Sequence, residues 1–173
     1  MDDIVIRSLH KWPDLPAVYG WLRLDRRGNW RIRTSATGNS ANFEPIGNAA
    51  FRAFIGRNYA PDQRGCWFFQ NGPQRVFIAL DCTPLVFRFS GNSLIDHLGH
   101  ESGSVEGAWL DEEGSLIIKA EHGVGVMDDR DLVPIAEELA QGFLIVEPRR
   151  VQVGELASGD LEARFGFVKD PKP

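Results

Sequence analysis

One short segment near the middle of the chain concentrates the residue types that bind metal ions. Residues 96–101 read Asp-His-Leu-Gly-His-Glu, and another histidine follows in the next polar turn. Histidine and carboxylate side chains are usual zinc ligands, and three of them with an open position make a catalytic site. The spacing differs from the metalloprotease helices, which need His-Glu-x-x-His or His-x-x-Glu-His. A metal-dependent hydrolase is therefore one hypothesis, with an exposed polar connection as the alternative, and its candidate ligands are His97, His100, Glu101 and His122.

A second cluster is basic and aromatic, and it lies on a predicted β-hairpin. Guanidinium groups bind phosphates and aromatic rings stack on bases, so the pattern suits a nucleotide- or RNA-binding module. It suits an acidic protein surface equally well, and a solvated hairpin face is the simplest interpretation. The candidate binding residues are Tyr19, Trp21, Arg23, Arg26, Arg27, Arg31 and Arg33.

No catalytic residue can be assigned from motifs. The chain has no Gly-x-Ser-x-Gly elbow, and Cys66 and Cys82 lie in apolar runs without an adjacent activating base. Gly123-Val124-Gly125 precedes aspartates that would repel a phosphate but would cap a helix, so capping is the better interpretation. We predict no cofactor, and whether the protein is an enzyme stays open, with a non-enzymatic role favoured.

Composition and charge narrow the class of protein. Two cysteines in 173 residues favour a reducing compartment, and the acidic start and the lack of a long apolar run predict a cytoplasmic protein without a membrane partner. The net charge of −5 makes nucleic acid an unfavourable partner. The charge is uneven, because residues 1–90 carry a net +5 and residues 91–173 a net −10. Opposite charges at Arg26-Arg27 and Glu112-Glu113 could meet between the halves or across a homodimer.

Hydrophobic periodicity predicts the elements that position these residues. Residues 18–33 alternate as a hairpin with Gly28 in its turn, and residues 47–59 have helical spacing. A second hairpin spans 66–70 and 74–81, and a further strand spans 85–89. The second half has a similar order, with a hairpin near 107–119, a helix from 128 to 140, a hairpin at 143–153 and a last strand at 161–168.

The similar order predicts an internal duplication of a β-β-α-β-β-β unit. The predicted segments are a lead-in at 1–16, a first repeat at 17–90, a connector at 91–103, a second repeat at 104–168 and a tail at 169–173. Chance similarity between two hairpin-helix-hairpin patterns is the alternative. The fold class that follows is α+β, mostly antiparallel β with two main helices.

Four stretches resemble an uncharacterised proteobacterial family, a domain of unknown function. They read Tyr-Gly-Trp-Leu-Arg-Leu-Asp-Arg-Arg-Gly-Asn-Trp-Arg at 19–31, Arg-Asn-Tyr-Ala at 57–60, Trp-Phe-Phe-Gln-Asn-Gly-Pro-Gln-Arg-Val at 67–76 and Asp-Asp-Arg-Asp-Leu at 128–132. The element order also resembles a second such family, built from repeated α+β motifs, for which a role in ligand sensing or signalling has been suggested. The resemblance implies no catalytic residues. It favours a non-catalytic protein that binds a small molecule or a protein, with a regulatory or signalling role.

Overall fold

Strands dominate the computed structural model, which describes residues 1–12, 15–34 and 42–173. The chain forms two compact units. The first comprises Met1–Asp25, Asn29–Asp81 and Gly166–Pro173, and the second comprises Arg26–Gly28 and Cys82–Phe165. Each unit has its own sheet, and most strand pairs are antiparallel, so the predicted α+β class is confirmed.

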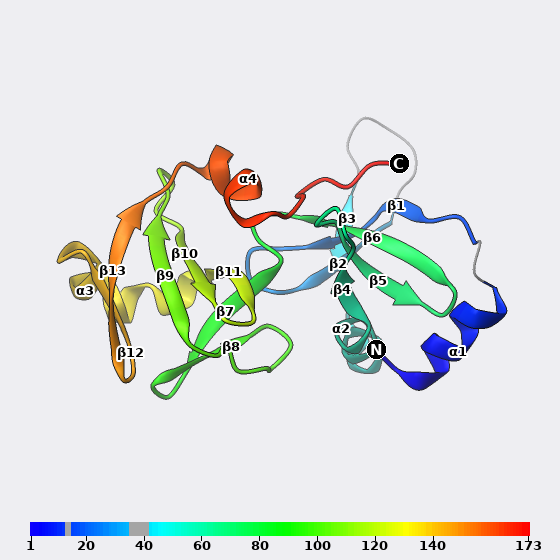
Figure 1. Ribbon diagram of the computed structural model, residues 1–173, viewed down its shortest axis with the longest axis horizontal. Helices are drawn as coiled ribbons and strands as arrows, with labels where there is room; N and C mark the ends of the chain where they lie inside the picture. Colours follow the sequence, from blue (N-terminus) through cyan, green and yellow to red (C-terminus); the bar gives the residue numbers. More distant parts are fainter. Residues whose placement is uncertain (13–14, 35–41) are drawn as a thin grey trace. The chain divides into compact units, whose positions relative to one another are not determined.

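The first unit contains a six-stranded sheet in the order β3-β2-β1-β6-β5-β4 (Figure 1). Its β1 and β6 pair in parallel, and the other neighbours are antiparallel. The strands are β1 (Val18–Leu24), β2 (Trp30–Arg33), β3 (Phe43–Pro45), β4 (Tyr59–Pro61), β5 (Trp67–Asn71) and β6 (Gln74–Leu80).

The predicted hairpin at 18–33 is confirmed as β1 and β2. Leu24 pairs with Trp30 and Leu22 with Ile32, so these four side chains share one face of the sheet. Leu22, Leu24 and Trp30 are at most 4% exposed, whereas Ile32 is 36% exposed because it lies near the edge formed by β3. The alternation therefore predicted the face correctly, but not the depth of burial at the edge.

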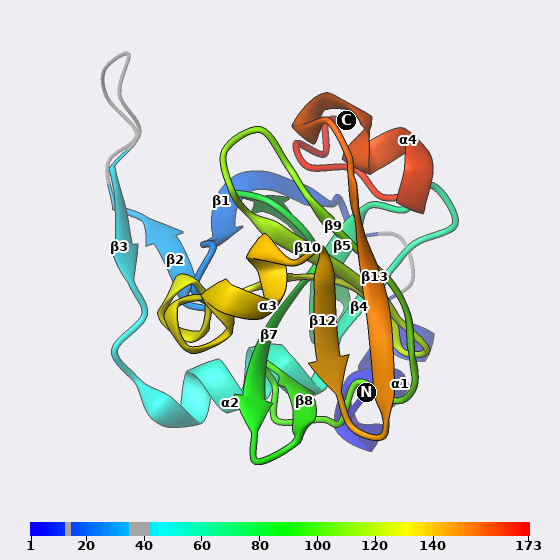
Figure 2. The same cartoon turned by 90° about the vertical axis from the view of Figure 1, so that its left-hand side faces the viewer.

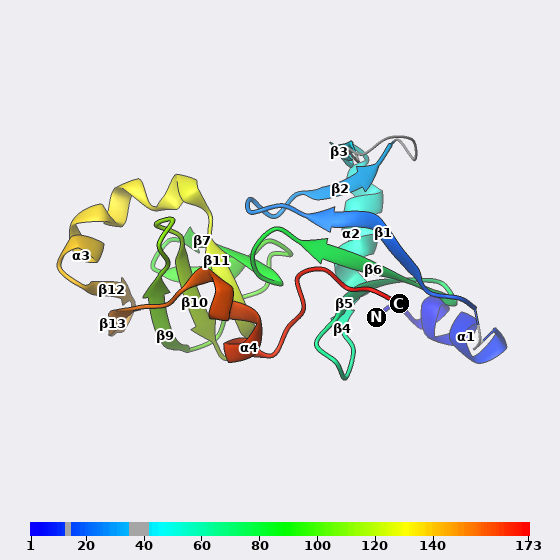
Figure 3. The ribbon, with the colours of Figure 1, turned by 90° about the horizontal axis from the view of Figure 1, so that it is seen from above.

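Helix α2 (Ala49–Arg57) covers this apolar face (Figure 3). Asn48 caps its first turn, since the side-chain oxygen accepts a hydrogen bond from the Phe51 N–H. The rings of Phe51 and Phe54 then meet the buried ring of Phe69 edge-on, and Ile55 is fully buried. Helix α1 (Asp3–Lys11), which periodicity did not predict, buries only Val5.

The second unit contains a seven-stranded sheet in the order β12-β13-β9-β10-β11-β7-β8. Its long hairpin of β12 and β13 stands beside β9 in Figure 2, with β13 and β9 in parallel. The strands are β7 (Leu85–Ser90), β8 (Ser93–Asp96), β9 (Val105–Leu110), β10 (Leu116–Ala120), β11 (Gly123–Met127), β12 (Phe143–Val146) and β13 (Arg149–Glu155).

Two predictions in the second half were wrong in detail. The expected helix from 128 to 140 begins as two 3-10 turns, Asp129–Asp131 and Val133–Ile135, and only α3 (Ala136–Ala140) is α-helical. The expected last strand at 161–168 is instead α4 (Leu161–Phe165), which ends before Gly166, where φ is +69°. Beyond it, Val168 bridges to Cys66 and returns the chain to the first unit.

The helices of the described ranges are short, and the longest have nine residues. None of those helices is both long and apolar enough to cross a membrane.

The two sheets share a strand order. The series β3-β2-β1-β6-β5 in the first unit matches β11-β10-β9-β13-β12 in the second. In both series an antiparallel hairpin leads to a third strand and a helix, and a second hairpin returns to lie parallel to the first strand. The remaining strands differ, because β7, which the sequence placed in the first repeat, and β8, which lies in the predicted connector, extend the second sheet. The duplication and its predicted boundaries stay a prediction.

Gly125 shows how tightly the second sheet is packed, and it supplies the first testable prediction. A Cβ atom there would lie 2.5 Å from the Phe87 ring, and that ring is fully buried. Gly125→Ala should therefore lower the free energy of unfolding by about 1–3 kcal/mol through overpacking, measured by urea denaturation.

Gly159→Ala is the matched control, because no atom lies within 4 Å of its added Cβ and its φ is not positive. Its effect on the free energy of unfolding should stay within about 1 kcal/mol. Equal destabilisation by the two variants would contradict this description of the core.

Candidate functional site

The predicted arginine surface forms only in part. Arg23 pairs with Arg31 across β1 and β2, and Trp21 and Arg33 share their face, opposite the buried leucines. Trp21 is 47% exposed. Tyr19 is half-buried, and its ring stacks on Phe77 with centroids 4.7 Å apart.

Carboxylates in the same unit already neutralise the two central arginines of this face. Arg23 Nη1 lies 2.8 Å from Asp81 Oδ1, and its guanidinium also stacks on the Phe43 ring. Arg31 Nε donates to Asp25 Oδ2 at 2.9 Å. An incoming phosphate would have to compete with these carboxylates, which weakens the nucleotide- or RNA-binding hypothesis.

Arg26 and Arg27 belong to the second unit and so are not part of that face. Arg26 pairs with Glu113 at 2.8 Å, and Arg27 makes two hydrogen bonds to Asp129, at 2.7 and 3.0 Å. Opposite charges at these turns therefore meet within one unit. A homodimer through opposite charges stays a prediction.

The four candidate metal ligands do not converge. His100 Nδ1 lies 3.4 Å from Asp96, His122 Nδ1 lies 2.7 Å from the backbone oxygen of Glu101, and His97 Nδ1 accepts a hydrogen bond from the Val86 N–H at 3.3 Å. No group of three His, Cys, Asp or Glu side chains in the described part of the chain could hold a metal ion. The hydrolase hypothesis therefore lacks its ligand set.

Neither cysteine forms a disulfide among the described residues, and both are buried, at 5% exposure for Cys66 and 2% for Cys82. Burial raises the pKa of the Cys66 thiol, so the thiolate that a nucleophile needs is disfavoured. Cys66 instead packs against Phe68 and Phe77 as a small apolar side chain.

The strongest electrostatic cluster lies where β11 ends. Asp128 is fully buried, and its Oδ1 accepts hydrogen bonds from the Arg130 N–H at 3.0 Å and from Arg130 Nε at 2.8 Å. The Arg130 side chain is the main cause that lowers the pKa of Asp128 to about 2. Asp131 lies nearby, pairs with Arg88 at 2.9 Å and accepts a hydrogen bond from the Phe89 N–H. These contacts join β7 to the first 3-10 turn, so the predicted capping role of Asp128 is confirmed.

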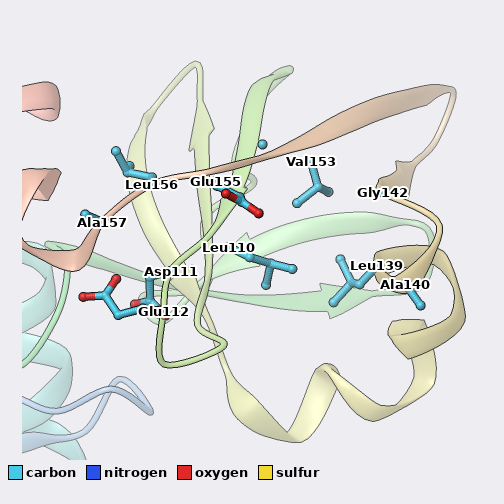
Figure 4. A pocket seen from close by; sticks show the side chains of 11 residues that line it. Leu110, Asp111, Glu112, Leu139, Ala140, Gly142, Val153, Glu155, Leu156 and Ala157 are labelled. Atoms are coloured by element: carbon cyan, nitrogen blue, oxygen red, sulfur yellow. The ribbon is translucent and has the colours of Figure 1, made fainter.

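A cleft of about 620 Å³ opens in the second unit, between α3 and the ends of β9 and β13 (Figure 4). Its apolar part consists of Leu110, Leu139 and Val153, which are only half-buried although they pack against the core of this unit. Three acidic residues also line the cleft, namely Asp111, Glu112 and Glu155. No basic residue of the described ranges lines it.

The first unit provides an internal reference for this cleft. In the first unit Leu24 pairs with Leu80, and Asp81, the residue after Leu80, donates its N–H to the Leu24 oxygen. In the second unit Leu110 pairs with Glu155 in the same way, and Leu156, the residue after Glu155, donates its N–H to the Leu110 oxygen. Leu24 is 1% and Leu80 is 5% exposed, so the position that is closed core in the first unit is open in the second.

The crossover helices also differ between the two units. Helix α2 has nine residues and places Phe54 and Ile55 on the sheet, whereas α3 has five residues and presents Leu139 and Ala140. A methyl group fills far less space than an aromatic ring, so the sheet next to α3 stays uncovered. Sequence patterns did not reveal the cleft, because the partner of Leu110 is fixed only by the parallel pairing of β13 with β9.

A family model described as "Protein of unknown function (DUF2946)" matches residues 1–172. The chain belongs to this family. The resemblance expected from the sequence is thereby confirmed, and the family brings no established activity. No curated protein matches the chain.

A crystal structure of a DUF1285 family protein from Silicibacter pomeroyi DSS-3 is similar in fold. The two chains are 14% identical, the match covers 88% of this chain and 91% of that chain, and the TM-score is 0.50. At that identity the likeness concerns the fold alone.

The Asp128 cluster gives a prediction about pH. Because the pKa of Asp128 is lowered from 3.8 to about 2 in the folded protein, its stabilisation is complete above pH 4 and is lost as the pH falls towards 2. Asp128→Asn should cost about 2 kcal/mol in the free energy of unfolding at pH 7 and progressively less at pH 4 and pH 3, measured by urea denaturation.

Asp160→Asn is the control for the same chemical change, because Asp160 is exposed and makes no side-chain interaction within the described residues. Its effect should be small at every pH. A destabilisation by Asp128→Asn that does not change with pH would contradict the role of the ionised carboxylate.

Proposed function

We propose that this protein is a non-catalytic binding protein, and that the cleft between α3, β9 and β13 holds a small ligand. The observation that carries the proposal is the half-exposed apolar floor of Leu110, Leu139 and Val153 at a position that the first unit closes. A cleft of about 620 Å³ is of the size that small-molecule sites have.

Energetics support a bound ligand. Apolar surface left in water costs roughly 25 cal/mol per Å², and a ligand that covers the three side chains recovers this cost. In the first unit the chain itself buries the side chains at the corresponding position, Leu24 and Leu80. In the second unit a ligand would take the place of the missing helix side chains.

The groups that line this cleft favour binding over cysteine-, histidine- or metal-based catalysis. Neither cysteine nor any histidine lines it, and its carboxylates stand in no group of three metal ligands within the described ranges. Binding needs only shape, apolar surface and a few polar groups. A regulatory role, in which occupancy of the cleft is the signal, fits such a site.

A second candidate function is binding of a protein partner at the outer face of β1 and β2. The observation that favours it is Trp21, which is 47% exposed beside Arg23 and Arg31. Tryptophan and arginine are enriched in protein interfaces. Trp21→Ala would then weaken the partner complex without changing ligand binding in the cleft.

The proposed function is tested by filling the cleft. Ligand-observed NMR with a fragment library of cations, anions and neutral compounds first identifies small molecules that bind the wild-type protein. Ala140→Trp should place a ring in the cleft and abolish their binding. Ala136→Trp is the matched control, because Ala136 is exposed on the same helix but does not line the cleft.

Fragments that bind the wild-type protein and Ala136→Trp, but not Ala140→Trp, would support the proposal. Fragments that bind all three proteins equally would place the site elsewhere and overturn it. Both variants should give wild-type circular dichroism spectra, so that loss of binding is not loss of folding.

A further inference from the structure

We infer that the cleft in the second unit takes an organic cation carried on an apolar stem, such as an alkylguanidinium or alkylammonium group. This inference rests on the proposed function of the cleft and names the chemical class of its ligand. It depends on the identity of one residue, Glu155, and on the charge around it.

Glu155 occupies the position at which the first unit has a buried leucine. Because Glu155 pairs with Leu110 and lies two residues after Val153, its side chain projects from the same face as these apolar residues. Glu155 is exposed, and its carboxylate has no hydrogen bond or ion pair among the described residues. Figure 4 shows it turned towards the space between Leu110 and Val153. A carboxylate beside an open apolar floor favours a ligand with a complementary positive group.

Asp111 adds a second carboxylate to the lining of the cleft. Asp111 is 7% exposed, and its Oδ2 has no hydrogen-bond partner in the part of the chain that the structure describes. Asp25 holds the corresponding position in the first unit, and there the Arg31 guanidinium lies against its Oδ2. In the second unit the residue that corresponds to Arg31 is Ile117, which offers Asp111 no cation. Glu112, by contrast, is held by two hydrogen bonds from Ser158.

The whole second unit favours a cation. It contains eight Lys and Arg residues against sixteen Asp and Glu residues, a net charge of −8. A field of this sign raises the local concentration of cations and repels anions. Because no Lys, Arg or His lines the cleft, an anionic ligand would find no counter-charge there.

The apolar floor decides between an organic cation and a metal ion. Divalent metals such as calcium take six to eight oxygen ligands, and the carboxylates of the cleft form no group of three within the described residues. Leu110, Leu139 and Val153 would instead contact the hydrocarbon stem of an amphipathic cation.

The test compares three probes that share a butyl stem and differ in charge, namely butylguanidinium, butylurea and pentanoate. Binding is followed by ¹H–¹⁵N NMR shifts of the full chain, at low and high salt. Butylguanidinium should shift the amides of Gly142, Gly154 and Glu155, and added salt should weaken its binding. Glu155→Gln should weaken it about fivefold, since Glu155 is exposed and water screens an ion pair at an exposed carboxylate.

Glu137→Gln is the matched control, because Glu137 is exposed on α3, does not line the cleft and gives the same change in net charge. It should leave the affinity for butylguanidinium within about twofold. Glu155→Leu, which installs the leucine of the first unit, should abolish the preference for the cation.

The outcomes separate the inference from the function on which it rests. If butylurea or pentanoate shifts the cleft amides as strongly as butylguanidinium, the cleft binds ligands but the cation inference is wrong. If no probe shifts these amides and no library fragment competes for the cleft, the proposed function itself fails. A peptide with one central arginine is tested alongside. Tighter binding of this peptide than of butylguanidinium would indicate that the cation belongs to a protein chain, and weaker binding would indicate a free molecule. Either result supports the inference.

Discussion

Parallel pairing of the first and last strands of each motif is the constraint on which the rest of the structure depends. β1 lies beside β6, and β9 lies beside β13, and in each case the chain must cross from one end of the sheet to the other between them. Such a crossover needs a connection of a dozen or more residues, which usually contains a helix. The sheets, the positions of α2 and α3, and the presence or absence of a cleft all follow from how each crossover is built.

Local patterns predicted the elements on either side of these crossovers but not the pairing itself. Alternation located the hairpins at β1–β2, β5–β6 and β12–β13, because each hairpin is set by its own turn and its own apolar face. Helix α4 was missed because Leu161–Phe165 is short, and its alternating apolar residues fit a strand equally well. The assignment of β7 to the second sheet depends on its long-range pairing with β11, which no local signal reports.

The candidate sites show the same limit. The alternation correctly placed Arg23 and Arg31 on one face. It did not show that both arginines form ion pairs within the chain, with Asp81 and Asp25 respectively. No sequence pattern marked Glu155 as a binding residue, because acidic residues are common at the ends of strands. It becomes informative only when the register sets it opposite Leu110, where the first unit sets Leu80 opposite Leu24.

The return of Gly166–Pro173 to the first unit has a consequence for biosynthesis. Val168 bridges to Cys66 and packs on the cluster of Cys66, Phe68 and Phe77, and Lys169 accepts a hydrogen bond from the Leu80 N–H. All residues of the second unit therefore leave the ribosome before those that complete the first. The first unit therefore cannot complete its aromatic cluster until the whole of the second unit has been synthesised.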